Sequence, residues 1–315
     1  MTRIGLVLGA GGALGASWTV GALSALQDHL GWDARAADAV VGTSAGAVVA
    51  AMLGGGVAIK SLLNSQRGFQ TDEVPFEYDY QAERARPPLP KLRVGSAPLL
   101  LRSALRPWQI SPLVTVSAWL LEGRGNLDHI GSVVSQVVPA GEWPAGTRIV
   151  AMDFDSGDRV AFGGEDAPAA EFSDAVMASC AIPGWYAPVR INGRRYVDGG
   201  TFSRSNLDLV AGEGLDIVYV FAPMAALGAI PSSGAGRVEH FLRSVANRQL
   251  RKEADVVRAS GTRVVLLAPG PQDLDAIGAN VMDPKRRERV LETSLRTSAA
   301  AVAVADADHP LPATG

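Results

Sequence analysis

The stretch VVGTSAG, residues 40–46, places a serine between two glycines, directly after a short apolar run and before the small-residue run AVVAAM. The pattern Gly-x-Ser-x-Gly between a strand and a helix is typical of a nucleophile elbow. In such an elbow Gly42 and Gly46 would let the chain bend sharply, and the hydroxyl of Ser44 would stand at the carboxyl end of the strand. The alternative is that Ser44 is one more small residue where a buried helix packs.

Apolar runs typical of buried strands alternate with helical patterns along most of the chain. We expect strands over 3–8, 38–42, 147–154, 159–163, 215–223 and 262–270, a hairpin over 187–200 that turns at Asn192–Gly193, and helices over 17–30, 45–53, 172–180, 237–259 and 284–305. Strands that alternate with helices in this way predict an α/β sandwich with a largely parallel sheet.

The composition narrows the classes of protein. Of the 315 residues 47% are hydrophobic and 19% charged, as in a globular chain, and the net charge of −3 gives no sign of a nucleic-acid partner. The single cysteine, Cys180, excludes an intramolecular disulfide and fits a reducing compartment. The uncharged runs 4–27 and 39–59 are interpreted as strand–turn–helix units and not as membrane spans, and the apolar run after Met1 is too short for a signal peptide. We therefore expect a cytoplasmic protein.

A glycine-rich turn, LGAGGALG at residues 8–15, follows the first expected strand. It does not match the dinucleotide-binding fingerprint, because Leu14 stands where the third glycine is needed, and it has no lysine for a phosphate loop. What remains is a row of backbone N–H groups at the start of a helix, which can bind a negative oxygen. That oxygen could belong to a phosphate or to a tetrahedral intermediate, or the glycines could serve close helix–strand packing alone.

A serine nucleophile needs a base, and Asp198 is the best-placed candidate. It ends the expected strand RRYV and precedes Gly199 and Gly200, which permit a tight, exposed turn. A carboxylate that takes the serine proton would form a two-residue catalytic unit. The alternative is an ordinary turn aspartate. The four histidines are interpreted as surface or packing residues, no residues have metal-ligand spacing, and no cofactor is predicted.

Three stretches together resemble the patatin-like phospholipases: LGAGGALGASWTVGAL, VVGTSAGAVVAAM and FSDAVMASCAIPGWYAPVRINGRRYVDGG. The resemblance covers roughly residues 3–223 and is weak over 67–146. It implies a three-layer α/β/α sandwich, a lipid acyl hydrolase, Ser44 as the nucleophile and Asp198 as the base. It also implies oxyanion donors from the backbone of Gly11 and Gly12, with Ala13 as a third. Two positions depart from the family pattern, because Ala10 replaces a glycine and Leu14 replaces a basic residue.

The segment from about 67 to 112 is rich in proline and arginine and shows no clean period. We expect a single domain over 1–306 with this segment as a cap-like insertion, and a loose tail over 307–315. Leu100, Trp108 and Trp185 are expected to line an acyl pocket, and the basic residues could let the cap touch an anionic lipid surface. The alternative is a solvated insertion. The expected substrate is a lipid or another acyl ester. Acyl transfer, thioester or lactone cleavage and non-catalytic lipid binding remain alternatives.

Overall fold

The computed structural model describes residues 2–69, 76–77, 88–226 and 237–308, without the side chains of 237–242 and 306–308. The strands are β1 (Ile4–Leu8), β2 (Ala39–Thr43), β3 (Thr147–Asp153), β4 (Arg159–Phe162), β5 (Val189–Ile191), β6 (Arg194–Asp198), β7 (Ile217–Phe221) and β8 (Arg263–Leu267). The helices are α1 (Gly12–Leu30), α2 (Ala45–Gly54), α3 (Ile59–Gln66), α5 (Ala97–Leu105), α6 (Pro112–Trp119), α7 (Asp128–Val137), α8 (Phe172–Cys180), α9 (Arg237–Ala259), α10 (Pro271–Ile277) and α11 (Arg287–Asp308).

The described residues form an eight-stranded sheet in the order β5-β6-β3-β2-β1-β7-β8, with β4 paired to β3 outside this path. The pairs β1–β2, β1–β7, β2–β3 and β7–β8 are parallel, while β3–β4, β3–β6 and β5–β6 are antiparallel. The predicted hairpin is confirmed: β5 and β6 are joined at Asn192 and Gly193, which both have positive φ. The sheet is therefore parallel in its centre and antiparallel at the β5–β6 edge.

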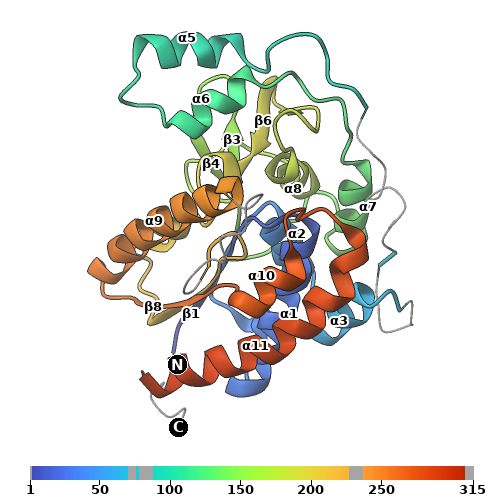
Figure 1. Ribbon diagram of the computed structural model, residues 1–315, viewed down its shortest axis with the longest axis vertical. Coiled ribbons are helices and arrows are strands. Elements are labelled where there is room, and N and C mark those ends of the chain that lie inside the picture. Colours follow the sequence, from blue (N-terminus) through green and yellow to red (C-terminus); the bar gives the residue numbers. More distant parts are fainter. Residues whose placement is uncertain (1, 70–75, 78–87, 227–236, 309–315) are drawn as a thin grey trace.

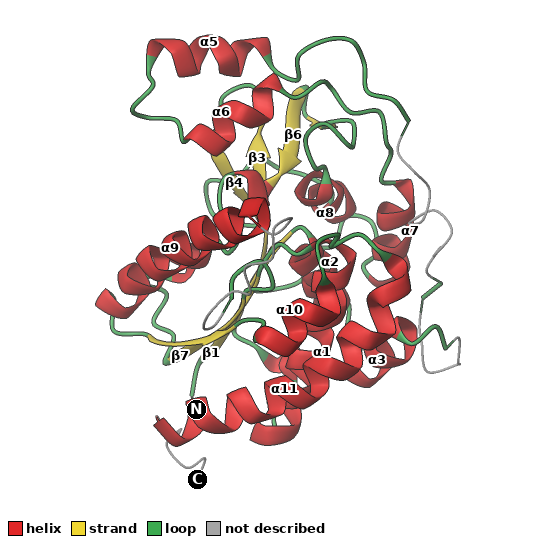
Figure 2. Ribbon diagram, viewed as in Figure 1, coloured by secondary structure: helices red, strands yellow, loops and turns green. Residues whose placement is uncertain are grey.

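Helices cover both faces of the sheet (Figures 1 and 2). Leu6 and Leu8 of β1 belong to a core shared with α1, α2, α8 and α11. Val7, which points to the opposite face, belongs to a second core that contains Leu250 and Val257 of α9. The alternation of buried side chains along one strand thus builds two cores, and the predicted three-layer α/β/α sandwich is confirmed.

The described part of the segment interpreted as a cap contains helix α5, and helix α6 begins where that segment ends. Both helices lie over the ends of β3 and β6 (Figure 1). Leu99 of α5 and Val114 of α6 pack with Phe154 and Val197 in a small third core. Residues 70–75 and 78–87 of the predicted insertion lie outside the described residues. The tail predicted over 307–315 is outside them as well, except that α11 continues to Asp308.

The start of α1 was predicted wrongly, and helices α3, α5, α6, α7 and α10 were not predicted. The glycine-rich turn was expected over 9–16, but α1 begins at Gly12, because Ala13, Leu14 and Ala16 favour a helix and the Leu14 side chain is buried in the core. Ser96 caps α5 by accepting the Leu99 N–H, and a proline lies in its first turn. No helix in the described ranges is long and apolar enough to span a bilayer.

Candidate active site

Ser44 lies at the turn between β2 and α2, with φ 53 and ψ −120. Positive φ is strained for a serine and persists only where the surroundings hold it. A Cβ at Gly46 would lie 2.0 Å from the Leu8 carbonyl oxygen, so only glycine permits this approach of α2 to β1. The Ser44 N–H donates to the Ser179 hydroxyl at 2.8 Å, and Ser179 in turn donates to the Val150 carbonyl at 2.6 Å. The geometry is that of a nucleophile elbow.

Strand pairing brings Asp198 to Ser44. Thr43, the last residue of β2, pairs with Val150, and Asp198, the last residue of β6, pairs with the next residue of β3, Ala151. Strands β2 and β6 therefore end at adjacent positions of β3, which brings the Ser44 hydroxyl beside the Asp198 carboxyl, where it acts to lower the pKa of that carboxyl.

The Asp198 carboxylate is buried, with 6% of the residue exposed. Its Oδ1 accepts the Gly200 N–H at 2.7 Å. Burial raises the pKa of Asp198 from 3.8 to about 6, while the hydrogen bonds from Ser44 and Gly200 and the charge of Arg204 act in the lowering direction. A carboxylate with this pKa is ionised at neutral pH and can accept a proton at a small energetic cost.

The glycine loop lies beside this pair. The amides of Gly9 and Ala10 donate to Phe221 O and Arg204 O, both at 2.8 Å. Within the described part of the chain, no backbone acceptor faces the amides of Gly11, Gly12 and Ala13, which lie at the start of α1. Gly12 has φ 62, which favours glycine, and a Cβ there would lie 2.9 Å from a methionine sulfur. The loop thus presents free N–H groups at a helix N-terminus next to Ser44, an arrangement suited to an oxyanion.

Leu14, the position where the family pattern has a basic residue, is fully buried in the core of α1 and α11. Its amide donates to the Val281 carbonyl at 2.9 Å. The leucine is therefore a packing residue at the base of the loop, and its side chain faces away from the site.

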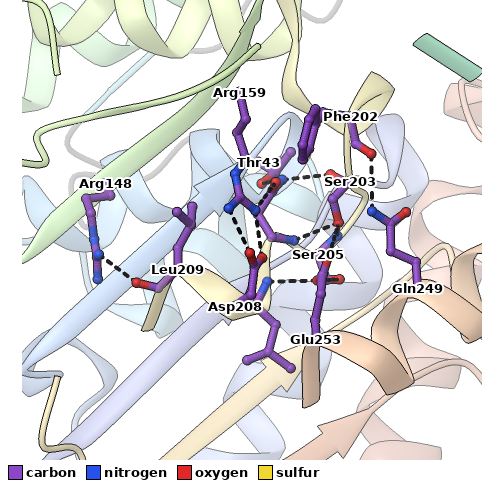
Figure 3. Close-up of polar contacts among 12 residues, drawn as sticks. Thr43, Arg148, Arg159, Phe202, Ser203, Ser205, Asp208, Leu209, Gln249 and Glu253 are labelled. Carbon is purple, nitrogen blue, oxygen red and sulfur yellow. Dashed lines mark hydrogen bonds and ion pairs between the residues drawn. The ribbon is translucent and has the colours of Figure 1, made fainter. Parts of the chain in front are cut away.

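A buried polar network holds the loop that follows β6 (Figure 3). The carboxylate of Glu253 on α9 accepts the hydroxyls of Ser203 and Ser205 at 2.5 and 2.6 Å. Asn206, the next residue along, donates to the Thr43 hydroxyl at 3.0 Å, directly before the elbow serine. These contacts were not predicted from the sequence. They connect the loop after Asp198 both to α9 and to the end of β2.

Two pockets meet at Ser44. The first, the apolar pocket, has a volume of about 100 Å³ and is lined mainly by small and apolar side chains, with Gln66, His129 and Arg287 among the polar ones; its apolar lining includes Ala16, Val48, Leu127, Ile130, Cys180, Tyr186 and Met282. The second, the Asp198 pocket, has a volume of about 260 Å³ and contains Asp198, Gly200, Thr201 and Arg204 together with Leu113, Val116 and Leu120. Gly12, Ser44 and Ile182 line both pockets.

The three residues expected to line an acyl pocket are not brought to the site. Leu100 packs against the small core under α5 and α6. Trp108 is 80% exposed. Trp185 stacks on Tyr186, and it is Tyr186 that lines the apolar pocket. His129, interpreted from the sequence as a surface or packing residue, also lines this pocket.

The fold is similar to those of two solved proteins. VipD from Legionella pneumophila is 16% identical with a TM-score of 0.47, over 96% of this chain and 67% of VipD. The type III effector protein ExoU is 18% identical with a TM-score of 0.40, over 96% of this chain and 53% of ExoU, so the chain spans about half of that protein. The family model described as patatin-like phospholipase matches residues 6–211, which include the glycine loop, the elbow and Asp198. The chain belongs to the patatin-like phospholipase family.

Proposed function

We propose that this chain is a serine acyl hydrolase that cleaves carboxylic esters of lipids, with Ser44 as the nucleophile and Asp198 as the base. The observation that carries the proposal is that Ser44 and Asp198 line one pocket, with the serine at an elbow where it is held at positive φ. Membership of a lipid acyl hydrolase family supports the same class of reaction. The raised pKa of Asp198 supports its assignment as the group that moves the proton.

In the proposed reaction Asp198 takes the proton of the Ser44 hydroxyl while the serine oxygen attacks the acyl carbonyl. The amides of Gly11 and Gly12, with Ala13, would hold the negative oxygen of the tetrahedral intermediate. Asp198 then returns the proton to the leaving alkoxide, and an acyl-enzyme forms. Water attacks the acyl-enzyme, Asp198 accepts a proton from the water and passes it to Ser44, and the fatty acid is released.

The two pockets suggest how a substrate is oriented. The apolar pocket suits the acyl chain, because its lining is mainly aliphatic and it opens at Ser44. The leaving oxygen has to approach Asp198 in order to receive the proton, so the alcohol part of the substrate would occupy the Asp198 pocket. This assignment replaces the acyl-pocket residues expected from the sequence.

The dyad is tested by kinetics of Ser44→Ala, Asp198→Asn and the double variant on p-nitrophenyl esters and on diacylglycerophospholipids. Each single change should lower kcat by on the order of 10⁴ or more, and the double variant should lose little beyond the larger single loss, because the two residues act as one unit. Ser117→Ala is the matched control, since Ser117 lines the Asp198 pocket but bonds only to the Val114 carbonyl. Additive losses, or a Ser44→Ala protein that keeps most of its activity, would contradict the proposal.

We also propose that the cap contacts a lipid surface through exposed apolar side chains. The apolar lobe, formed by the cap and by the residues after it up to 121, consists of Leu89, Leu92, Leu101, Leu105, Trp108, Val116, Trp119, Leu120 and Leu121, all more than a third exposed. Val116 and Leu120 also line the Asp198 pocket, so the lobe is continuous with the mouth of the site. The basic residues contribute less than the sequence indicates, because Lys91 and Arg93 pair with Glu122.

Sedimentation with phospholipid vesicles tests this contact. Leu105→Ser and Trp108→Ser should weaken the partition into vesicles, because these side chains are 67% and 80% exposed and would insert into the lipid. Val256→Ser is the control, since Val256 is 53% exposed on α9, outside the lobe. If all three variants partition alike, the lobe does not bind lipid.

A further inference from the structure

The Asp198 pocket holds a cation that the proposed reaction does not use. Arg204 lies six residues after Asp198 and lines this pocket together with Ser44 and Asp198. Its carbonyl oxygen accepts the amide of Ala10 at 2.8 Å, so its backbone is fixed against the glycine loop. Among the described residues, no carboxylate lies within ion-pair distance of its guanidinium, and the guanidinium donates no hydrogen bond. Arg204 is thus a fixed cation beside the site with its donors available.

The charges near Arg204 only partly neutralise its guanidinium. Burial lowers the pKa of Arg204, Asp198 acts in the raising direction, and the nearby Arg243 acts in the lowering direction. Arg243 on α9 is buried and donates to the carbonyls of Pro223 and Ala225 at 3.1 and 3.0 Å. Among the residues whose side chains are described, the charges that act on Arg204 are therefore a second cation, Arg243, and one carboxylate, Asp198. A buried guanidinium in this setting favours an additional anion.

We propose that Arg204 determines the specificity of the Asp198 pocket by binding an anionic group, a phosphate ester, on the leaving-group side of the substrate. This inference rests on the proposed function, because the proton has to pass from Asp198 to the leaving oxygen. Whatever is attached to that oxygen then lies in the pocket that Arg204 lines. In a glycerophospholipid the phosphate is a few bonds from the ester oxygen, and a guanidinium matches its geometry.

The proton transfer itself strengthens this interaction. While Asp198 is ionised, its charge attracts Arg204 and competes with a substrate anion. When Asp198 takes the proton of Ser44 it becomes neutral, and the substrate phosphate is then the anion that faces Arg204. The attraction is therefore larger in the transition state than in the ground state, which is the condition under which an interaction raises kcat.

A pair of soluble substrates tests the inference: dihexanoyl-glycerophosphate, which carries the anion, and dihexanoylglycerol, which lacks it. Arg204→Gln should lower kcat/KM for the phosphate substrate at least tenfold more than for the neutral one, with Arg204→Lys between Gln and wild type. Arg106→Gln is the control, because Arg106 is an exposed arginine of the cap. Binding of glycerol 3-phosphate to the Ser44→Ala protein, measured by calorimetry, should be lost when Arg204→Gln is added.

The outcomes separate this inference from the proposed function. If Arg204→Gln lowers kcat/KM equally for both substrates and moves the acidic limb of the pH profile to higher pH, Arg204 is a positioning residue for Asp198. That result would overturn the inference but not the proposed hydrolase activity. Retained binding of glycerol 3-phosphate in the Arg204→Gln background would overturn it as well. If no ester is hydrolysed but glycerol 3-phosphate binds through Arg204, the anion site stands and the hydrolase proposal fails.

Discussion

Replacing Asp198 by Asn should stabilise the fold at neutral pH while abolishing turnover. The carboxyl has a pKa of about 6 in the native state against an ordinary value of 3.8, because it is buried. The native state therefore binds the proton more tightly than the unfolded state. At about 1.36 kcal/mol per pKa unit, the difference between the two pKa values lowers the stability of the ionised native state by about 3 kcal/mol. Asparagine resembles the protonated acid and can still accept the Gly200 N–H, so it avoids this cost.

The sign fixes the pH window of the effect. Well below pH 3.8 the carboxyl is protonated in both states, and the variant and the wild type should have the same free energy of unfolding; at pH 4 they should still differ by less than about 1 kcal/mol. As the pH rises through 6 the wild type loses stability from this group, and the variant should become more stable by up to about 3 kcal/mol at pH 7. Urea unfolding at pH 4 and pH 7 measures the difference.

The control is Asp255→Asn, because Asp255 is 76% exposed and pairs with Arg258 of its own helix. That change should stay within about 0.5 kcal/mol at both pH values. The reasoning is refuted if Asp198→Asn is less stable than the wild type at pH 7, or if its advantage does not change between pH 4 and pH 7.

Three further predictions concern the elbow, the apolar pocket and the base. Gly46→Ala should prevent folding or cost more than about 3 kcal/mol in urea unfolding, because its Cβ would lie 2.0 Å from a carbonyl oxygen of β1; Gly270→Ala, with no atom closer than 3.7 Å, should be tolerated. Ala16→Leu should lower kcat/KM for long-chain p-nitrophenyl esters about 200-fold relative to acetyl esters, if the larger side chain excludes four methylenes of the acyl chain from the apolar pocket at about 0.8 kcal/mol each. Trp108→Ser, at an exposed residue, should leave this ratio unchanged. The kcat/KM of the wild type should fall below about pH 6, as Asp198 becomes protonated, and a flat profile between pH 5 and 8 would argue against Asp198 as the base.

Local signals in the sequence account for most of the sandwich. The apolar run before Gly42 predicts strand β2, and the turn at Asn192–Gly193 predicts the β5–β6 hairpin. Both signals depend only on residues that are adjacent in the sequence. Ser44 was chosen as a candidate because it lies between glycines directly after a strand, and Asp198 because it ends a strand before two glycines. Their proximity depends on the pairing of β2 and β6 with adjacent residues of β3, which no local pattern records.

The pockets could not be predicted in the same way. The apolar pocket is assembled from residues as far apart as Ala16, Ile130 and Met282, so no window of sequence contains it. Trp108 resembles a pocket residue in type, but α5 packs through Leu99 and Leu100, and Leu101, Leu105 and the following Trp108 stay exposed. No sequence pattern singled out Arg204, because its burial near Asp198 and Arg243 results from the fold.

The most direct test of the central claim is covalent labelling with a fluorophosphonate, followed by peptide mass spectrometry. This reagent reacts with an activated serine hydroxyl, so the wild type should be modified at Ser44 alone, Asp198→Asn should react far more slowly, and Ser44→Ala should not react. Ser117→Ala, which alters the same pocket, should be labelled like the wild type. A folded wild-type protein that stays unlabelled, or that is modified at a serine other than Ser44, would contradict the assignment of Ser44 as the nucleophile.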